Sequence, residues 1–175
     1  EELRTRNKEH ETEIKKYEVT IQTGNYNHKE FLIIDPPLVW ATYYGGAGTL
    51  GGGYEFGDDI KTDASGNIYV TGRTASSNLP VQNPGALAYY VGTAIAQNDA
   101  FILKFDAAGV LIWATYYGGT WHDAGHTIAI DNANSKIYIC GHACQNFPVT
   151  NTLGAGAFYQ PVFGAGGNNF DGFIL

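Results

Sequence analysis

The heptapeptide WATYYGG occurs twice in this 175-residue chain, at residues 40–46 and again at residues 113–119. A tryptophan, two tyrosines and two glycines do not recur in one order by chance. Each copy is followed by a glycine-rich loop that contains an acidic residue, Glu55 in the first copy and Asp123 in the second. The similarity therefore extends beyond the heptapeptide and indicates a repeated structural unit.

The rest of the two copies can be aligned segment by segment. The matching segments are DDIKTD (58–63) with HTIAID (126–131), NIYVTGRT (67–74) with KIYICGHA (136–143), NLPV (78–81) with NFPV (146–149), and DAFILKF (99–105) with DGFIL (171–175). The offset between copies varies by only a few residues, so short insertions fall in the loops. The repeating unit is about 70 residues long.

Each unit contains candidate β-strands and no helical periodicity. The strand candidates are rich in β-branched and aromatic residues, and the turns DASGN and DAAG place glycine where a short hairpin needs a positive φ. The strands AFILKF and IWATYY carry apolar residues on both faces, whereas a sheet with one wet face should alternate. This pattern favours the blade of a β-propeller, which is covered on both faces by its neighbours.

The linked motifs resemble the bacterial β-propeller repeat family known as SBBP. The resemblance lies in WATYYGG, GDDI with DASGNIYVTGRT, NLPV and DAFILKFD, and it covers residues 38–175. It implies an all-β fold of β-propeller blades, each a four-stranded antiparallel meander, with about two blades of a larger ring in this chain. It also implies a secreted or cell-surface bacterial protein linked to adhesion or gliding. The family brings no agreed enzymatic activity, catalytic residue or cofactor.

The expected organisation has two parts. Residues 1–37 are interpreted as a charged lead-in and β-hairpin at the end of an upstream domain. In the propeller region, residues 38–44 are expected to form an outer strand, residues 58–117 a blade, and residues 126–175 a partial blade. By the usual closure of propellers, the first strand would complete the C-terminal blade. Two blades cannot close a ring, so we expect either a chain cut from a longer protein, as the absence of methionine favours, or three copies in a six-bladed ring.

Charge and hydropathy limit the partners. The net charge is −7, and residues 31–175 carry four basic and ten acidic groups, a surface that repels phosphate backbones and argues against nucleic acid. No apolar run reaches the ~20 residues of a membrane-spanning helix. The expected partners are further propeller blades, of the same chain or of other copies, together with carbohydrate or surface proteins. Loop residues suited to sugar contacts are Trp121, Tyr54, Asn168 and Asn169.

The second copy contains a group of histidines and cysteines: His122, His126, Cys140, His142 and Cys144. Their spacing superficially fits zinc ligands, but the predicted strand and loop positions do not gather them, so variation between repeats is preferred to a metal site. In an extended strand the two cysteines would lie roughly 13 Å apart, which favours free thiols over a disulfide, although a bend after Gly141 would change that.

Recurrent aspartates are a second candidate site. Asp58, Asp59 and Asp63 precede a turn, and Asp131 recurs at the position of Asp63. The spacing of a calcium loop is absent, so caps on turn backbone are preferred to calcium ligands.

No nucleophile elbow, zinc-protease motif or phosphate-binding loop is present. The leading hypothesis is a non-catalytic surface scaffold that binds protein or carbohydrate. The alternatives are an enzyme with its active site in the central channel, for which His126 is the one indication, and a structural spacer.

Overall fold

The computed structural model describes residues 39–47, 54–85, 89–94, 96, 98–150, 156–164 and 169–175. The chain divides into two compact units, Glu1–Val39 and Trp40–Leu175. The lead-in and hairpin predicted for residues 1–37 lie outside the described residues and stay predictions. The second unit contains all the strands below.

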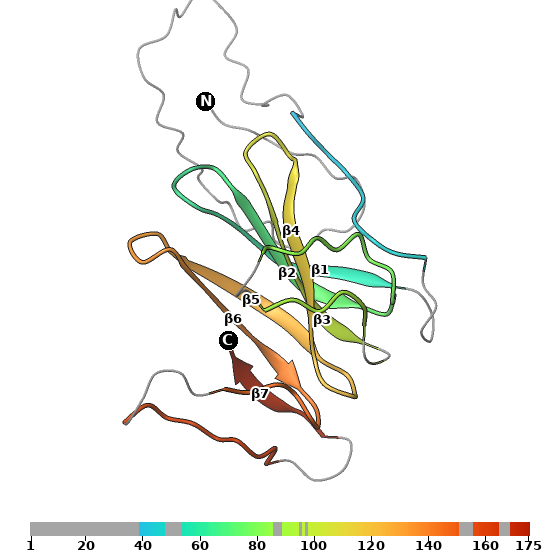
Figure 1. Cartoon of the computed structure of the whole chain (residues 1–175), viewed down its shortest axis with the longest axis vertical. Coiled ribbons are helices and arrows are strands. Elements are labelled where there is room, and N and C mark those ends of the chain that lie inside the picture. Colours follow the sequence, from blue (N-terminus) through green and yellow to red (C-terminus); the bar gives the residue numbers. More distant parts are fainter. Residues whose placement is uncertain are drawn as a thin grey trace, which may run out of the picture. The chain divides into compact units, whose positions relative to one another are not determined.

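The described residues form two antiparallel β-sheets and no helix (Figure 1). Sheet A has the order β1 (Glu55–Thr62), β2 (Ile68–Thr74), β3 (Asp99–Phe105) and β4 (Leu111–Tyr117). Sheet B has the order β5 (Ala124–Asp131), β6 (Lys136–Ala143) and β7 (Asp171–Ile174). The all-β prediction and the positions of these strands are confirmed.

The sequence repeat is also a repeat of strand pairing. Thr71 pairs with Ile102 in sheet A, and at the equivalent positions Cys140 pairs with Ile174 in sheet B. Matching letters in the two copies therefore occupy matching places in the two sheets, and each residue of one copy can be compared with its counterpart in the other.

The hairpin turns depend on residues with positive φ. Gly66 closes the β1–β2 turn at φ 79° and Gly109 closes the β3–β4 turn at φ 81°, as the sequence predicted. The β5–β6 turn has Ser135 at the place of Gly66, with φ 53°. A serine in this left-handed region is less favourable than glycine because its Cβ crowds the backbone.

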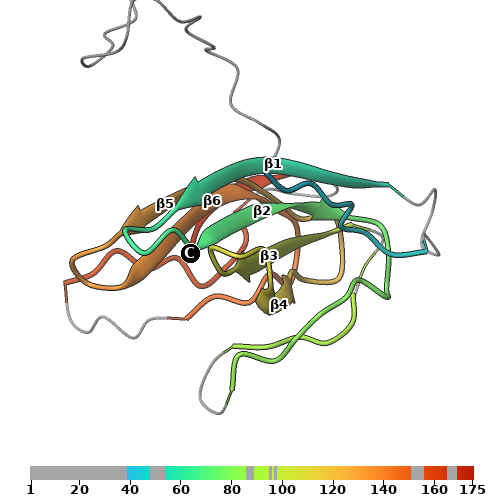
Figure 2. The same ribbon diagram turned by 90° about the horizontal axis from the view of Figure 1, so that it is seen from above.

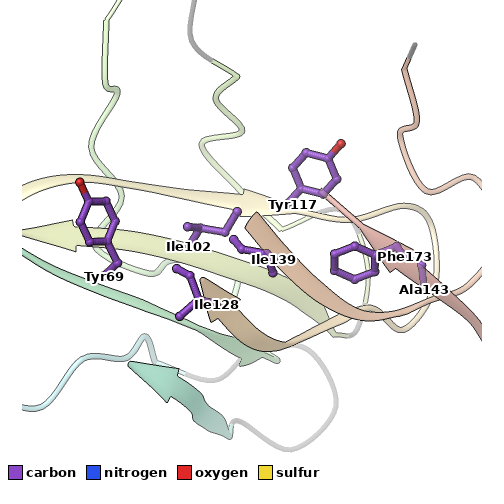
Figure 3. Close-up of a cluster of buried hydrophobic side chains, with 7 residues drawn as sticks. All are labelled: Tyr69, Ile102, Tyr117, Ile128, Ile139, Ala143 and Phe173. Atoms are coloured by element: carbon purple, nitrogen blue, oxygen red, sulfur yellow. The ribbon is translucent and has the colours of Figure 1, made fainter. Parts of the chain in front are cut away.

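The two sheets stack face to face. The shared core contains Tyr69, Ile102 and Tyr117 from sheet A and Ile128, Ile139, Ala143 and Phe173 from sheet B, all buried (Figure 3). A second cluster covers the other face of sheet A and includes Phe101, Leu103 and Tyr116 with Leu79 from the loop after β2. Strand β3 is thus buried on both faces, which explains why its sequence does not alternate.

The front and back of a sheet are defined by repeat-equivalent residues. The front face carries Val70 and Phe101 in sheet A and Ile139 and Phe173 in sheet B, and the back face carries Tyr69 and Ile102 in sheet A and Tyr138 and Ile174 in sheet B. The back of sheet A packs on the front of sheet B. The contact therefore joins two different faces.

The first WATYYGG does not form the predicted outer strand. The described part of that segment, residues 39–47, has no strand pairing, and it is the blue segment in Figure 2. Its Trp40 ring instead meets the Phe105 ring edge-on, with 5.3 Å between centroids. Among the described strands β7 pairs with β6 alone, and the expected closure of the C-terminal sheet by the first strand stays a prediction. A strand needs a neighbour that hydrogen-bonds its backbone, and none of the described strands pairs with this segment.

Candidate functional site

Each sheet has a β-bulge on its first strand, and the bulges hold equivalent residues. Pairing skips Asp58 between Gly57 and Asp59 in β1, and it skips His126 between Gly125 and Thr127 in β5. An extra residue of this kind does not oppose a partner residue and bends the strand, so its side chain takes a new direction. Two residues that the sequence singled out thus share one special backbone position.

A glycine on the neighbouring strand makes room for each bulge. A Cβ on Gly72 would lie 1.8 Å from the Phe56 carbonyl oxygen, and a Cβ on Gly141 would lie 1.9 Å from the Ala124 carbonyl oxygen. Any larger residue at either glycine would displace the bulged strand. Glycine stands at this position in both copies, but it does not by itself indicate a bulge.

The bulge of sheet B brings two of the candidate histidines together. His126 Nε2 lies 2.8 Å from His142 Nδ1, and His126 Nδ1 lies 3.6 Å from the Asp58 carboxylate of the other sheet. The Phe170 ring covers His142 edge-on, with 4.4 Å between centroids. We call Asp58, His126 and His142 the bulge cluster.

The surroundings of His142 disfavour its protonated form. Burial lowers the pKa of His142, and the neighbouring His126 and Arg73 lower it further, against the opposite effect of Asp58. The two ring nitrogens are closer than the about 3.3 Å that separates two ligands of a tetrahedral zinc ion with bonds of about 2.0 Å. The pair therefore has the geometry of a hydrogen bond, suited to holding or passing a proton. No group of three or more His, Cys, Asp or Glu among the described residues is arranged to hold a metal ion.

The other candidate ligands have different partners from this pair. His122 contacts the Asn98 amide, and Cys140 is exposed on β6. Cys144 is buried, and its Sγ lies 3.5 Å from the Asn169 carbonyl oxygen. Both cysteines are free thiols.

The aspartates cap backbone groups. The Asp63 carboxylate accepts bonds from the Ser65 and Asn67 N–H groups, and Asp131 accepts from Ala133 and Asn134 in the equivalent turn. These bonds have the form of the predicted turn caps.

Asp59 instead joins the two sheets. Its carboxylate accepts the Ile128 N–H at 2.9 Å and the Thr127 hydroxyl at 3.0 Å. The Lys61 ammonium, 2.6 Å away, and the Ile128 N–H hold the pKa of Asp59 well below its usual range. A charged carboxylate thus satisfies an N–H on the edge strand β5.

The acidic residue after each WATYYGG binds the second glycine of that motif. The Gly119 N–H donates to the buried Asp123 carboxylate at 2.6 Å, and the Gly46 N–H donates to Glu55 at 3.4 Å. The other Asp123 oxygen accepts the Cys144 N–H at 2.9 Å. Burial raises the pKa of Asp123 to about 6, against the effect of these bonds. The sequence showed this acidic residue as a recurrent feature but not its role.

The second tyrosine of each WATYYGG binds the proline loop that follows. The Tyr117 hydroxyl donates to the Pro148 carbonyl at 2.7 Å, and the Tyr44 hydroxyl donates to the Pro80 carbonyl at 2.9 Å. Burial raises the pKa of Tyr117 to about 12, so its hydroxyl stays a donor at neutral pH. Residues 40–46 therefore contact sheet A as residues 113–119 contact sheet B.

The outer faces of the stack carry exposed apolar side chains at some positions, although the cluster around Leu79 covers part of the front of sheet A. Ile60, on the front of sheet A, is 58% exposed, whereas its counterpart Ile128 is 1% exposed beneath sheet A. Ile174, on the back of sheet B, is 84% exposed, whereas its counterpart Ile102 is 5% exposed. Ile60 and Ile174 are thus exposed counterparts of residues that are buried inside the stack.

Two of the predicted sugar-contact residues, Trp121 and Tyr54, are exposed. Tyr54 packs against the Phe56 ring, and the Arg73 guanidinium lies 4.7 Å from the centre of that ring. Asn168 lies outside the described residues, and the Asn169 carbonyl contacts Cys144.

Among the described residues there is no helix with the length and hydrophobicity needed to cross a membrane. A comparison with models of known protein families finds no match for the chain, and a comparison with curated proteins finds none either.

Proposed function

We propose that residues 38–175 are blades of a β-propeller and act as a non-catalytic repeat module on the bacterial surface. The observation that carries the proposal is the head-to-tail stacking of two equivalent sheets, back of A on front of B. When two equivalent sheets bury the same face of each, the contact is complete and no third sheet can repeat it. When the back of one sheet packs on the front of the next, one front face and one back face stay available, so further repeats can be added by the same contact.

The placement of equivalent strands supports the propeller form of this stacking. The first strands of the two sheets are joined by Asp59 and Ile128, and their turns are joined by the Ala64 N–H and the Asn132 side chain at 2.8 Å. Equivalent ends thus lie together, as they do where blades surround one axis. In this arrangement β1 and β5 are the inner strands, and Asp58 and His126 of the bulge cluster lie on them.

A repeat stack of this kind is a rigid base for the loops between its strands. The aromatic pair Tyr54 and Phe56, with Arg73 over it, offers a stacking surface with a charged group, which suits a sugar ring or a protein side chain. We therefore assign the module to scaffolding and to binding carbohydrate or surface proteins.

A glycan array probed with the purified chain tests the binding role. We expect binding that is lost in the variant Tyr54→Ala/Phe56→Ala and kept in Tyr159→Ala, which removes a tyrosine of the same exposure, 40%. Binding to no glycan and to no isolated surface protein would contradict the proposal.

A second candidate function is an enzyme of the central channel, favoured by the bulge cluster alone. His126 has a carboxylate near one ring nitrogen and an imidazole at the other, a chain suited to general acid–base chemistry. A screen of hydrolase substrates with wild type and His126→Ala tests it. Activity that His126→Ala abolishes would replace the scaffold proposal, and equal rates in both proteins would remove the enzyme hypothesis.

A further inference from the structure

We propose that Tyr54, Phe56 and Arg73 form a binding site for an acidic carbohydrate, in which the two rings contact a sugar and the Arg73 guanidinium pairs with a carboxylate on that sugar. The inference rests on the proposed function, since it takes carbohydrate binding by the module as its basis. It goes further by naming the class of ligand and the residue that selects it. We call Tyr54, Phe56 and Arg73 the aromatic–arginine site.

Strand pairing places the three side chains together. Phe56 of β1 lies directly opposite Arg73 of β2, so the two side chains share one face of sheet A. The Arg73 guanidinium lies 4.7 Å from the centre of the Phe56 ring. Tyr54 precedes β1, and its ring lies 5.3 Å from the Phe56 ring, centre to centre, at an angle of 55°. One guanidinium and two neighbouring rings are thus gathered by the local geometry of a single pair of strands.

Arg73 has no acidic partner among the described residues. Its Nε is buried and has no hydrogen-bond partner there, although the residue as a whole is partly exposed. The ion pairs between described residues join other groups, Lys61 with Asp59 and His126 with Asp58. A buried N–H group without a partner costs free energy. A ligand with an acceptor for this group would therefore be favoured.

The nearby acid does not neutralise the arginine. Asp58 follows Phe56 by two residues, but it lies in the bulge, and its carboxylate is 3.6 Å from His126. The charge of Arg73 instead acts on His142 and lowers the pKa of that histidine. The positive charge at this edge of sheet A is therefore not used in an ion pair between described residues.

The second copy of the repeat does not have this site. The counterparts of its three residues in sheet B are His122, Ala124 and His142. Ala124 is fully buried, whereas Phe56 is 46% exposed. Both copies keep the bulge and the glycine beside it. The aromatic–arginine site is thus an addition to the shared framework, and three differences between the copies fall at one place.

A sugar acid has the groups that this site can bind. The C–H face of a sugar ring is apolar and can pack on the exposed rings of Tyr54 and Phe56. A carboxylate accepts two parallel hydrogen bonds from a guanidinium fork. In a hexuronic acid the carboxylate is attached to the sugar ring itself, so one residue of the ligand can make both contacts. An acidic peptide would supply the carboxylate without the ring face.

Three probes separate the contributions of the ring and of the carboxylate. A trisaccharide of galacturonic acid carries both, the neutral galactose trisaccharide carries the rings alone, and triglutamate carries the carboxylates alone. We expect the purified chain to bind the acidic trisaccharide at least about tenfold more tightly than either of the others, as measured by isothermal titration calorimetry.

The other outcomes of this titration reject different statements. Equal affinity for the acidic and the neutral trisaccharide would overturn the inference and leave the proposed function standing. Equal affinity for triglutamate would assign the site to acidic peptides and would also overturn it. Binding of none of the three probes would overturn the inference as well, and the proposed function would fall with it only if the glycan array and the isolated surface proteins gave no binding either.

A pair of charge-removing variants tests the role of the arginine. Arg73→Gln removes the fork, and the control Lys104→Gln removes a cation that lies 5.0 Å from the centre of the Tyr69 ring in the same sheet. We expect Arg73→Gln to weaken binding of the acidic trisaccharide about tenfold, to the affinity of the neutral one, and Lys104→Gln to leave it unchanged. Arg73→Lys keeps the charge without the fork and should bind with intermediate affinity. Equal affinities in the two glutamine variants would refute the site.

The Nε–H resonance of Arg73 gives a readout in the wild-type chain that needs no folded variant. The chain contains two other arginines, Arg4 and Arg6, so few such resonances have to be distinguished by NMR. We expect the Arg73 resonance to shift on addition of the acidic trisaccharide and to stay in place with the neutral one. An unchanged Arg73 resonance at a saturating concentration of the acidic trisaccharide would overturn the inference.

Discussion

Truncation of two equivalent isoleucines measures how much the stacking of the sheets stabilises the fold. Ile128→Ala removes three carbon atoms from a side chain that is buried between the sheets. At about 0.8 kcal/mol for each buried methylene, the lost transfer free energy is about 2.4 kcal/mol, and the cavity brings the expected cost to about 3 kcal/mol. Ile60→Ala removes the same atoms from the equivalent position, which is mostly exposed. Its expected cost is about 0.5 kcal/mol or less.

The assay is urea unfolding followed by tryptophan fluorescence, at a concentration where sedimentation shows single chains. With a denaturant slope of about 2 kcal/mol per molar, Ile128→Ala should lower the midpoint by about 1.5 M, and Ile60→Ala by about 0.25 M or less. The slope itself should stay unchanged, because the two variants expose the same surface on unfolding. Equal midpoint shifts would refute the reasoning, since they would mean that the back of sheet A does not cover Ile128.

Three further predictions concern the glycines, the turn and the buried acid. Gly141→Ala should lower the free energy of unfolding by about 2 kcal/mol or more, because the new methyl group overlaps the Ala124 carbonyl. The control is Gly57→Ala, because its methyl group would lie at an ordinary 3.8 Å from Val70. Gly57→Ala should lower the free energy of unfolding by less than half as much in the same urea titration. Ser135→Gly should relieve the left-handed backbone, raise the free energy of unfolding by about 0.5–1 kcal/mol and so raise the melting temperature, and Gly66→Ser should lower both. A change of the same sign in both variants would contradict the turn geometry. The pKa of Asp123 rises from 3.8 to about 6 on folding. The protonated Asp123 carboxyl therefore stabilises the fold fully below pH 3.8, and this stabilisation is lost as the pH rises through 6. An Asp123 carboxyl that titrates near 4 by NMR would contradict this.

The strand positions and the turns could be predicted from the sequence because the signals are local. A positive φ at Gly66 or Gly109 is a property of one residue, and the apolar runs of β3 and β4 show their burial directly. The repeat then supported each assignment with a second example. These features needed no knowledge of which segments meet in space.

The bulges and the segment 39–47 could not be predicted because they depend on partners. In the sequence, Asp58 and His126 look like ordinary strand residues, because the bulge is visible only once the strands are paired. The five histidines and cysteines of the second copy were therefore considered as one group of ligands, and the contact between His126 and His142 was missed. WATYYGG has the same letters in both copies, but only the second copy has a third strand beside it. Strand propensity is therefore realised at residues 113–117 and not at the same letters near Tyr43.

The bulge has a consequence for how such repeats diversify. Strand pairing does not involve the side chain of the extra residue in the bulge. The glycine on the neighbouring strand leaves room for the bulged backbone, whichever side chain the extra residue carries. An aspartate in one unit and a histidine in the next are accepted without any change of framework. A row of these units would present one variable side chain per unit at a constant spacing. Single substitutions at this position could therefore change what the row binds.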